Sequence, residues 1–258
     1  MRTQGMPEAR VLEAGIPYLI FVGTYWVVGG LFLLLELSPA ARDAWKGIKC
    51  QPARTMPWDS IRNITRNVGL QQLTVYPLAL WLLGPVVRQR CSFAPELPGV
   101  KETLFGLVVC AICAEVYFFH VHWALHHPKL YPHVHKVHHE FTAPIALECI
   151  YFHPIESVLN FGVISSGPLL LGSHVTLLYL FTAIGVFNVL VHHCGYEVLR
   201  PVTVRCHRLQ ITHHISPPAA PPPPPSAPTS RGPTSHLSPS HMLASTRSLS
   251  TPRQSSAA

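Results

Sequence analysis

The stretch that decides the fold runs Glu115-Val-Tyr-Phe-Phe-His-Val-His-Trp-Ala-Leu-His-His127, followed closely by His133-Val-His-Lys-Val-His-His139. Eight histidines fall within twenty residues here. On an α-helix, Glu115, His122 and His126 lie within about 40° of one face, because the two histidines follow Glu115 by 7 and 11 residues. The first stretch therefore predicts a helix that carries a stripe of metal ligands.

The second stretch repeats this arrangement. His135, His138 and His139 stand at i, i+3 and i+4, so a second helix would turn them towards the first stripe. Neutral imidazole binds iron, zinc and copper through one ring nitrogen, so histidines converging from two helices predict a transition-metal site. Three further histidines point off the main stripe, and the sequence leaves ligand and surface roles open for them: His120, His127 and His133.

Two more candidate ligands lie downstream, at the ends of apolar stretches. His153 stands in Tyr151-Phe-His-Pro-Ile-Glu156, and His193 precedes Cys194-Gly-Tyr196. Zinc sites close with three or four ligands that are often thiolates, whereas so many imidazoles fit two metal ions better. A dinuclear iron centre would bind O2 and oxidise an unactivated C–H bond, which no side chain can do alone. A zinc hydrolase is less favoured, because no general-base carboxylate stands in an HExxH arrangement.

Composition favours a membrane protein over a soluble domain. Of 258 residues, 48% are hydrophobic and 12% are charged, and the 17 histidines outnumber the 12 acidic residues. Soluble domains carry about 25% charged residues. The formal net charge of +7 could indicate nucleic acid, but the basic residues lie in loops beside apolar spans and no nucleic-acid-binding motif accompanies them. The expected partner is the lipid bilayer and not nucleic acid.

Four apolar stretches account for the hydropathy: Gly15–Leu37, Leu70–Val87, Leu104–Leu125 and Val158–Val191. A membrane's hydrocarbon core is about 30 Å thick. The fourth stretch is too long for one crossing and is interrupted by Gly-Pro and Gly-Ser, so it predicts a helical hairpin of two half-length or tilted passes. His174, in mid-hairpin, is expected in a turn or an interhelical contact. The sequence thus predicts an all-α integral membrane protein with about four transmembrane helices, a cytosolic histidine-rich helical cap and a disordered C-terminal tail.

Basic residues orient the expected spans. The segment between the first two spans holds six Lys and Arg against two Asp, and loops of this kind stay in the cytosol. Since the hairpin returns to its own side, residues 120–153 and 192–214 would both face the cytosol and could share one site. Asn63-Ile64-Thr65 is a glycosylation sequon, and its use would contradict this orientation because glycans are added in the lumen.

Composition changes after residue 197. No aromatic residue follows Tyr196, no acidic residue follows Glu197, and eleven prolines fall between Pro217 and Pro252. Such a segment cannot bury enough apolar surface to offset its ordering entropy, so disorder is expected from about Pro217 onward. The expected organisation is an N-terminal transmembrane region over residues 1–100, a histidine-box domain over 101–197 and a Pro/Ser-rich tail over 198–258.

Four short motifs resemble the histidine boxes of the fatty acid hydroxylase/sterol desaturase superfamily. They are His122-Trp-Ala-Leu-His126, His135-Lys-Val-His-His139, Glu140-Phe-Thr-Ala-Pro144 and His153-Pro-Ile-Glu156. The run HKVHHEFTAP is especially similar to the C4-methylsterol oxidase branch of that superfamily. The resemblance is strong from about Leu104 to Tyr196 and covers the upstream spans by architecture only.

The resemblance implies a multi-pass enzyme of the endoplasmic reticulum membrane that acts on a sterol or related lipid. It also implies a cytosolic di-iron centre, O2 as oxidant, and electrons delivered from NAD(P)H through cytochrome b5 and its reductase. By the same resemblance, seven histidines are expected iron ligands: His122, His126, His135, His138, His139, His153 and His193.

One family motif is missing from the sequence. Members carry a later HDxHH box, whereas this chain has Cys206-His207-Arg-Leu-Gln-Ile-Thr-His213-His214, a histidine pair without the preceding His-Asp. Fewer ligands would leave iron under-coordinated, so impaired oxygenase activity is expected from a C-terminally incomplete domain. The alternative is a non-catalytic regulatory membrane protein that retains the hydroxylase scaffold.

Overall fold

The computed structural model describes residues 10–51, 53–141 and 143–197. Over these ranges the chain forms helices and two isolated β-bridges, and no strand, which confirms the all-α prediction. The α-helices are α2 (Ile16–Leu37), α3 (Pro39–Trp45), α4 (Trp58–Leu73), α5 (Val75–Arg90), α6 (Val100–Leu125), α7 (Pro154–Leu171) and α8 (Val175–His193). The tail predicted over residues 198–258 lies outside the described residues.

Five helical stretches are long and apolar enough to cross a membrane: Val11–Leu37, Trp58–Arg90, Val100–Leu125, Pro154–Leu171 and Val175–His193. A helix satisfies its own backbone hydrogen bonds, so it can lie in hydrocarbon without exposing unpaired polar groups. The chain is therefore a multi-pass membrane protein, as predicted. It has one such stretch more than the four or so that were expected.

The extra stretch comes from the predicted hairpin, which α7 and α8 form. The two helices have 18 and 19 residues, or about 27 and 28 Å. Both arms are therefore long enough to cross a membrane, which excludes half-length passes and leaves the tilted passes that the prediction also allowed. The chain turns at Gly172, whose φ of 61° lies in the left-handed region that glycine favours. His174 then caps α8: its Nδ1 accepts from the Thr176 N–H, and its Nε2 bonds the Ala94 carbonyl at 2.8 Å, as expected of a turn residue.

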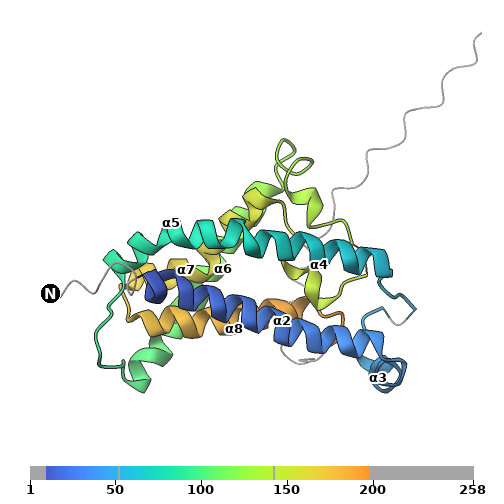
Figure 1. Cartoon of the computed structure of the whole chain (residues 1–258), viewed down its shortest axis with the longest axis horizontal. Helices are drawn as coiled ribbons and strands as arrows, with labels where there is room; N and C mark the ends of the chain where they lie inside the picture. Colours follow the sequence, from blue (N-terminus) through green and yellow to red (C-terminus); the bar gives the residue numbers. More distant parts are fainter. Residues whose placement is uncertain (1–9, 52, 142, 198–258) are drawn as a thin grey trace, which may run out of the picture. The chain divides into compact units, whose positions relative to one another are not determined.

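The basic segment between the first two spans contains a helix that the sequence analysis did not predict. Helix α4 begins at Trp58 and runs nearly directly into α5, and Figure 1 shows the two in line. Its buried residues Ile61, Ile64 and Val68 recur every three or four positions and face the 3₁₀ segment Ala146–Ile150. Charged residues interrupt this stripe, so the segment contains no continuous apolar run that would indicate a buried helix.

Two helix pairs organise the described part of the chain. Helix α2 lies along α8, and α6 packs most extensively against α7 (Figure 1). The second contact depends on Gly167 of α7: a Cβ atom added there would lie 2.5 Å from the Cα of Cys110 on α6. The missing side chain lets the two backbones approach closely, and this approach fixes α6 relative to α7.

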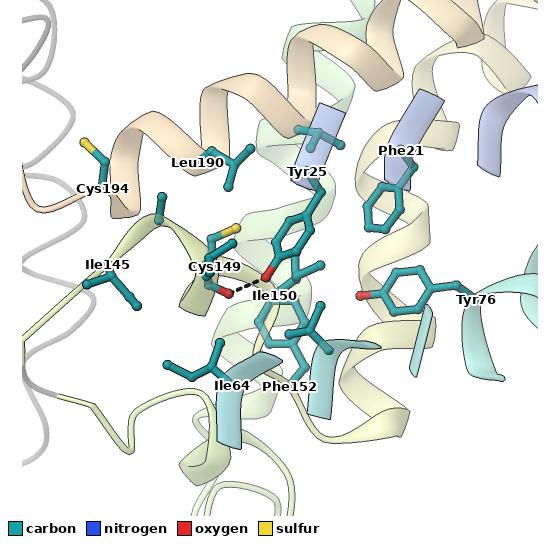
Figure 2. Close-up of a cluster of buried hydrophobic side chains, with 14 of the residues drawn as sticks. Phe21, Tyr25, Ile64, Tyr76, Ile145, Cys149, Ile150, Phe152, Leu190 and Cys194 are labelled. Atoms are coloured by element: carbon teal, nitrogen blue, oxygen red, sulfur yellow. Dashed lines mark hydrogen bonds between the residues drawn. The ribbon is translucent and has the colours of Figure 1, made fainter. Parts of the chain in front are cut away.

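The largest hydrophobic cluster surrounds the 3₁₀ segment Ala146–Ile150. Figure 2 shows Tyr25 of α2, Ile64 of α4 and Leu190 of α8 gathered around Cys149 and Ile150. The Tyr25 hydroxyl, fully buried, donates a 2.6 Å hydrogen bond to the carbonyl of Leu147. Three helices thereby hold in place the short segment that connects the histidine-rich loop to α7.

A buried polar group secures the chain just after α8. The Lys49 ammonium lies 2.6 Å from the Glu36 carboxylate, and the Tyr196 hydroxyl donates to the other Glu36 oxygen at 2.8 Å. Gly195 has a φ of 77°, and a Cβ atom there would lie 2.7 Å from the carbonyl oxygen of Pro144. The segment that follows His193 is therefore tied both to α2 and to the loop that precedes Ala146.

Substituting Gly167→Ala should destabilise the protein, because the new methyl group meets backbone and not a flexible side chain. We expect a loss of about 1–3 kcal/mol, seen as a lower midpoint of thermal unfolding of the detergent-solubilised chain. The matched control is Gly30→Ala on α2, where nothing lies within 4 Å of the added Cβ atom and Ala raises helix propensity. Equal midpoints for the two variants would contradict the close α6–α7 contact.

Candidate metal centre

Four of the seven predicted ligands come together at one end of α6. His122 lies in the last turn of this helix and His126 caps it, while His135 and His139 come from the following loop. One ring nitrogen from each of the four lies within 4.8 Å of all the others. The two Nε2 atoms of each i, i+4 pair are 3.1 Å apart, in His122 and His126 and again in His135 and His139. We call these residues the four-histidine cluster.

The second helix predicted for residues 135–139 is wrong. The structure has a single 3₁₀ turn, His135–Val137, flanked by other turns. This segment lies between Pro132 and Pro144, and a residue that precedes proline disfavours the helical conformation. The tight turn still brings His135 and His139 onto one side and leaves His138 directed elsewhere.

His135 is held by a carboxylate from α7. Its Nδ1 atom lies 2.8 Å from Oε1 of Glu156, and the two side chains are 0% and 2% exposed. A donor hydrogen bond from Nδ1 to a carboxylate fixes the tautomer and leaves Nε2 as the free lone pair, the arrangement common to metal-binding histidines. The sequence analysis names Glu156 only as part of a family motif and misses this role, although a carboxylate in the first turn of an apolar helix, about one turn before Asn160, is unusual.

His138 and His193 form a second group beside the four-histidine cluster. Their ring centroids are 5.4 Å apart, and the His193 Nδ1 lies 3.8 Å from the Glu148 carboxylate. Burial raises the pKa of Glu148, and the hydrogen bond and charge of His193 oppose that rise. The contact confirms that the two histidine-rich segments lie at the same end of the helices, which the shared site required.

The remaining sequence candidates lie elsewhere. His153 caps α7, where its Nδ1 accepts from the Ile155 N–H at 3.3 Å, outside the four-histidine cluster. Glu115 shares a helix face with His122 but stands about 10 Å below it along the axis, so it lines a cavity and not the cluster. Three histidines are exposed: His120, His127 and His133. The later candidates His207, His213 and His214 fall outside the described residues.

The donor set fits a transition-metal ion. Opposite ligands of one ion with metal–nitrogen bonds of about 2.1 Å stand about 4.2 Å apart. The four ring nitrogens already lie within 4.8 Å of one another, close to what one ion requires. Two buried carboxylate oxygens next to the histidines, Glu148 Oε2 and Glu156 Oε2, also have no hydrogen-bond partner among the described residues. Buried charge of this kind needs compensation, and a cation among the imidazoles would supply it.

Comparison with known proteins shows which family this part of the chain resembles. Residues 107–220 match the family model for fatty acid hydroxylase. This part of the chain is therefore similar to a fatty acid hydroxylase domain. The matched residues include the four-histidine cluster, Glu156 and both arms of the α7–α8 hairpin. The match continues to residue 220, so it also includes the segment with His207, His213 and His214; the domain boundary at residue 197 stays a prediction.

Curated relatives agree with the family match. The chain is 30% identical over 191 residues to human fatty acid hydroxylase domain-containing protein 2, covering 70% of this chain and 57% of the relative. It is 32% identical over 182 residues to a fatty acid hydroxylase of Mycosarcoma maydis, covering 67% of this chain and 45% of the relative. It is 33% identical over 103 residues to rat methylsterol monooxygenase 1, covering 40% of this chain and 35% of the relative. The chain spans about half the length of the first two of these relatives. No solved structure matches it.

Substituting Glu156→Gln should weaken metal binding without removing a ligand. The amide lacks the negative charge that holds the His135 Nδ1 proton, so affinity should fall about 10- to 100-fold. The measurement is metal content by mass spectrometry of the purified protein after titration with a chelator. Glu102→Gln, an exposed carboxylate in the first turn of α6, is the control and should bind as the wild type does. Unchanged affinity in the Glu156 variant would show that this carboxylate does not support the site.

Proposed function

We propose that this protein is a membrane-bound di-iron oxygenase that oxidises a sterol or related lipid. The observation that carries the proposal is the four-histidine cluster at the ends of apolar membrane helices, within the residues that match the fatty acid hydroxylase model. The relative named methylsterol monooxygenase supports a sterol as substrate class. A site next to hydrocarbon gives a lipid direct access from the bilayer.

Six of the described histidines have a role in this proposal. His122, His126, His135 and His139 hold iron, and His138 and His193 extend the donor set towards a second ion. When bound, iron supplies the activation of O2 that C–H oxidation requires. Glu156 retains the proton on His135 Nδ1, which keeps the Nε2 lone pair directed into the cluster. The sequence also assigns His153 as a ligand, and its position at the start of α7 leaves that assignment a prediction.

Aromatic rings exclude water from the lipid side of the site. The ring of Phe118 lies 5.1 Å from the His122 ring, and the ring of Phe152 lies 4.8 Å from the His138 ring. Low polarity there strengthens the electrostatic interactions of the buried carboxylates with the histidines. It also keeps bulk water from competing with a bound lipid.

The cellular setting follows from the family and the helices. We place the protein in the endoplasmic reticulum membrane with its histidines in the cytosol, receiving electrons from NAD(P)H through cytochrome b5 and its reductase. The missing HDxHH box at residues 198–220 favours a second candidate function, a non-catalytic regulatory membrane protein that keeps the hydroxylase scaffold. Turnover measurements separate the two candidates.

The full chain, purified and loaded anaerobically with Fe(II), should oxidise a methylsterol when supplied with O2, NADH, cytochrome b5 and its reductase. Replacing both His135 and His139 by Ala should lower product formation at least about 100-fold, because two ligands are lost together. Exposed His120 provides the control, and His120→Ala should retain wild-type turnover. Products are measured by mass spectrometry. A metal-loaded wild type without turnover would favour the regulatory function, and turnover that survives the double substitution would exclude the cluster as the reaction site.

The orientation has an independent test at the sequon. Asn63 is exposed on α4, in the segment that we place in the cytosol, so it should carry no glycan in protein made by mammalian cells. The electrophoretic mobility of the chain should therefore be unchanged by treatment with an N-glycosidase. A mobility shift that Asn63→Gln abolishes would place the histidines in the lumen.

A further inference from the structure

A cavity of about 410 Å³ lies between α6, α7 and α8, beside the metal centre. Most of its wall is apolar, with contributions from Phe118, Phe161, Val163 and Phe181. This volume falls in the range of sites that bind small molecules. Because its walls are membrane-spanning helices, the cavity is suited to a lipid.

The cavity ends at the histidines. Phe118 and Phe152 line it, and their rings are the ones that contact His122 and His138. Its other side is open: Glu115 on α6 and Asn188 on α8 line the cavity and are exposed. A lipid that enters laterally from the bilayer would therefore reach the metal centre with one end of the molecule.

Besides Tyr76, Ser157 and His192, three further polar side chains line the cavity, one each from α6, α7 and α8. They are Glu115 of α6, Asn160 of α7 and Asn188 of α8. In the described part of the chain none of them forms a hydrogen bond or an ion pair. Ser157, which also lines the cavity, differs because its hydroxyl donates to Gln71 at 2.6 Å. Polar groups within membrane spans are costly and mark functional sites, so three that converge on one cavity point to a ligand.

The three side chains lie at similar depths. Glu115 precedes His122 by seven residues, or about 10 Å along the helix. Asn160 follows Glu156 by four residues and Asn188 precedes His193 by five, or about 6 and 7.5 Å. They therefore line the cavity one to two turns from the histidines.

We propose that Glu115, Asn160 and Asn188 bind the hydroxyl group of an uncharged lipid substrate and so determine which lipids the site accepts. The amides can donate and accept hydrogen bonds, and the Glu115 carboxyl accepts one in either protonation state. A fatty acid is disfavoured, because two carboxyl groups that meet in an apolar cavity cannot both ionise without repulsion. This inference rests on the proposed function, since it assigns the substrate class of the same site.

Direct binding tests the inference without turnover. The full chain in detergent is immobilised on scintillation beads and binds tritiated cholesterol, which is then displaced with unlabelled cholesterol or with its 3-O-methyl ether. In the ether a methyl group replaces the hydroxyl proton, so the oxygen can no longer donate a hydrogen bond. The ether should compete about tenfold more weakly, the effect of losing one hydrogen bond. Equal competition by alcohol and ether would overturn the proposal, and so would the absence of saturable cholesterol binding.

Substitutions test whether the named residues cause the preference for the alcohol over the ether. Glu115→Leu and Asn188→Leu should each weaken cholesterol binding about tenfold and should reduce the preference for alcohol over ether. Glu102→Leu, on the same helix as Glu115 but outside this cavity, should leave both unchanged. If a variant does not purify as a monodisperse species, the competition of cholesterol with its ether on the wild-type protein still tests whether the site recognises the hydroxyl group. Variants that bind with the wild-type preference would overturn the assignment of these residues.

A further variant separates this inference from the proposed function. Replacing His135 and His139 by Ala should abolish metal binding and oxidation, yet cholesterol should still bind in preference to its ether. Binding with discrimination but without oxidation in the metal-loaded wild type would refute the oxygenase and retain the hydroxyl site. Oxidation without discrimination between alcohol and ether would retain the oxygenase and refute the hydroxyl site.

Discussion

The hydrogen bond between His135 and Glu156 is the contact on which the metal centre depends. It joins a loop that has only one 3₁₀ turn to the first turn of a membrane helix. Without it, His135 and His139 would belong to a loop with little regular structure of its own. With it, their Nε2 atoms face those of His122 and His126, and four nitrogens converge from two parts of the chain.

The rest of the fold serves to hold the two partners of that bond at a fixed distance. The close contact of α6 with α7 at Gly167 positions His122 relative to Glu156. The core around Ala146–Ile150 holds the segment that connects the histidine-rich loop to α7, and the Glu36 group secures the chain after His193. Apolar packing thereby places a polar site at the membrane ends of the helices, next to a cavity that hydrocarbon can fill.

Local pattern predicted much of this structure. Hydrophobic runs indicated the spans, the Gly172 turn indicated the hairpin, and histidine spacing identified all four members of the cluster. The residues that were missed act through tertiary contacts: Glu148 and Glu156 reach the histidines only after α7 and α8 fold back. Glu115 was grouped with the ligands because angular position on a helix says nothing about height along its axis. Helix α4 was missed because charged residues conceal its buried stripe.

The central claim is that imidazoles from α6 and from the following loop bind the same metal. Iron K-edge X-ray absorption of the full chain loaded with Fe(II) tests it most directly, because imidazole rings give a characteristic outer-shell signal. We expect a nitrogen-rich first shell with several imidazoles, which shrinks when either His122 or His135 is replaced by Ala. A spectrum dominated by oxygen ligands and unchanged by both substitutions would contradict the account.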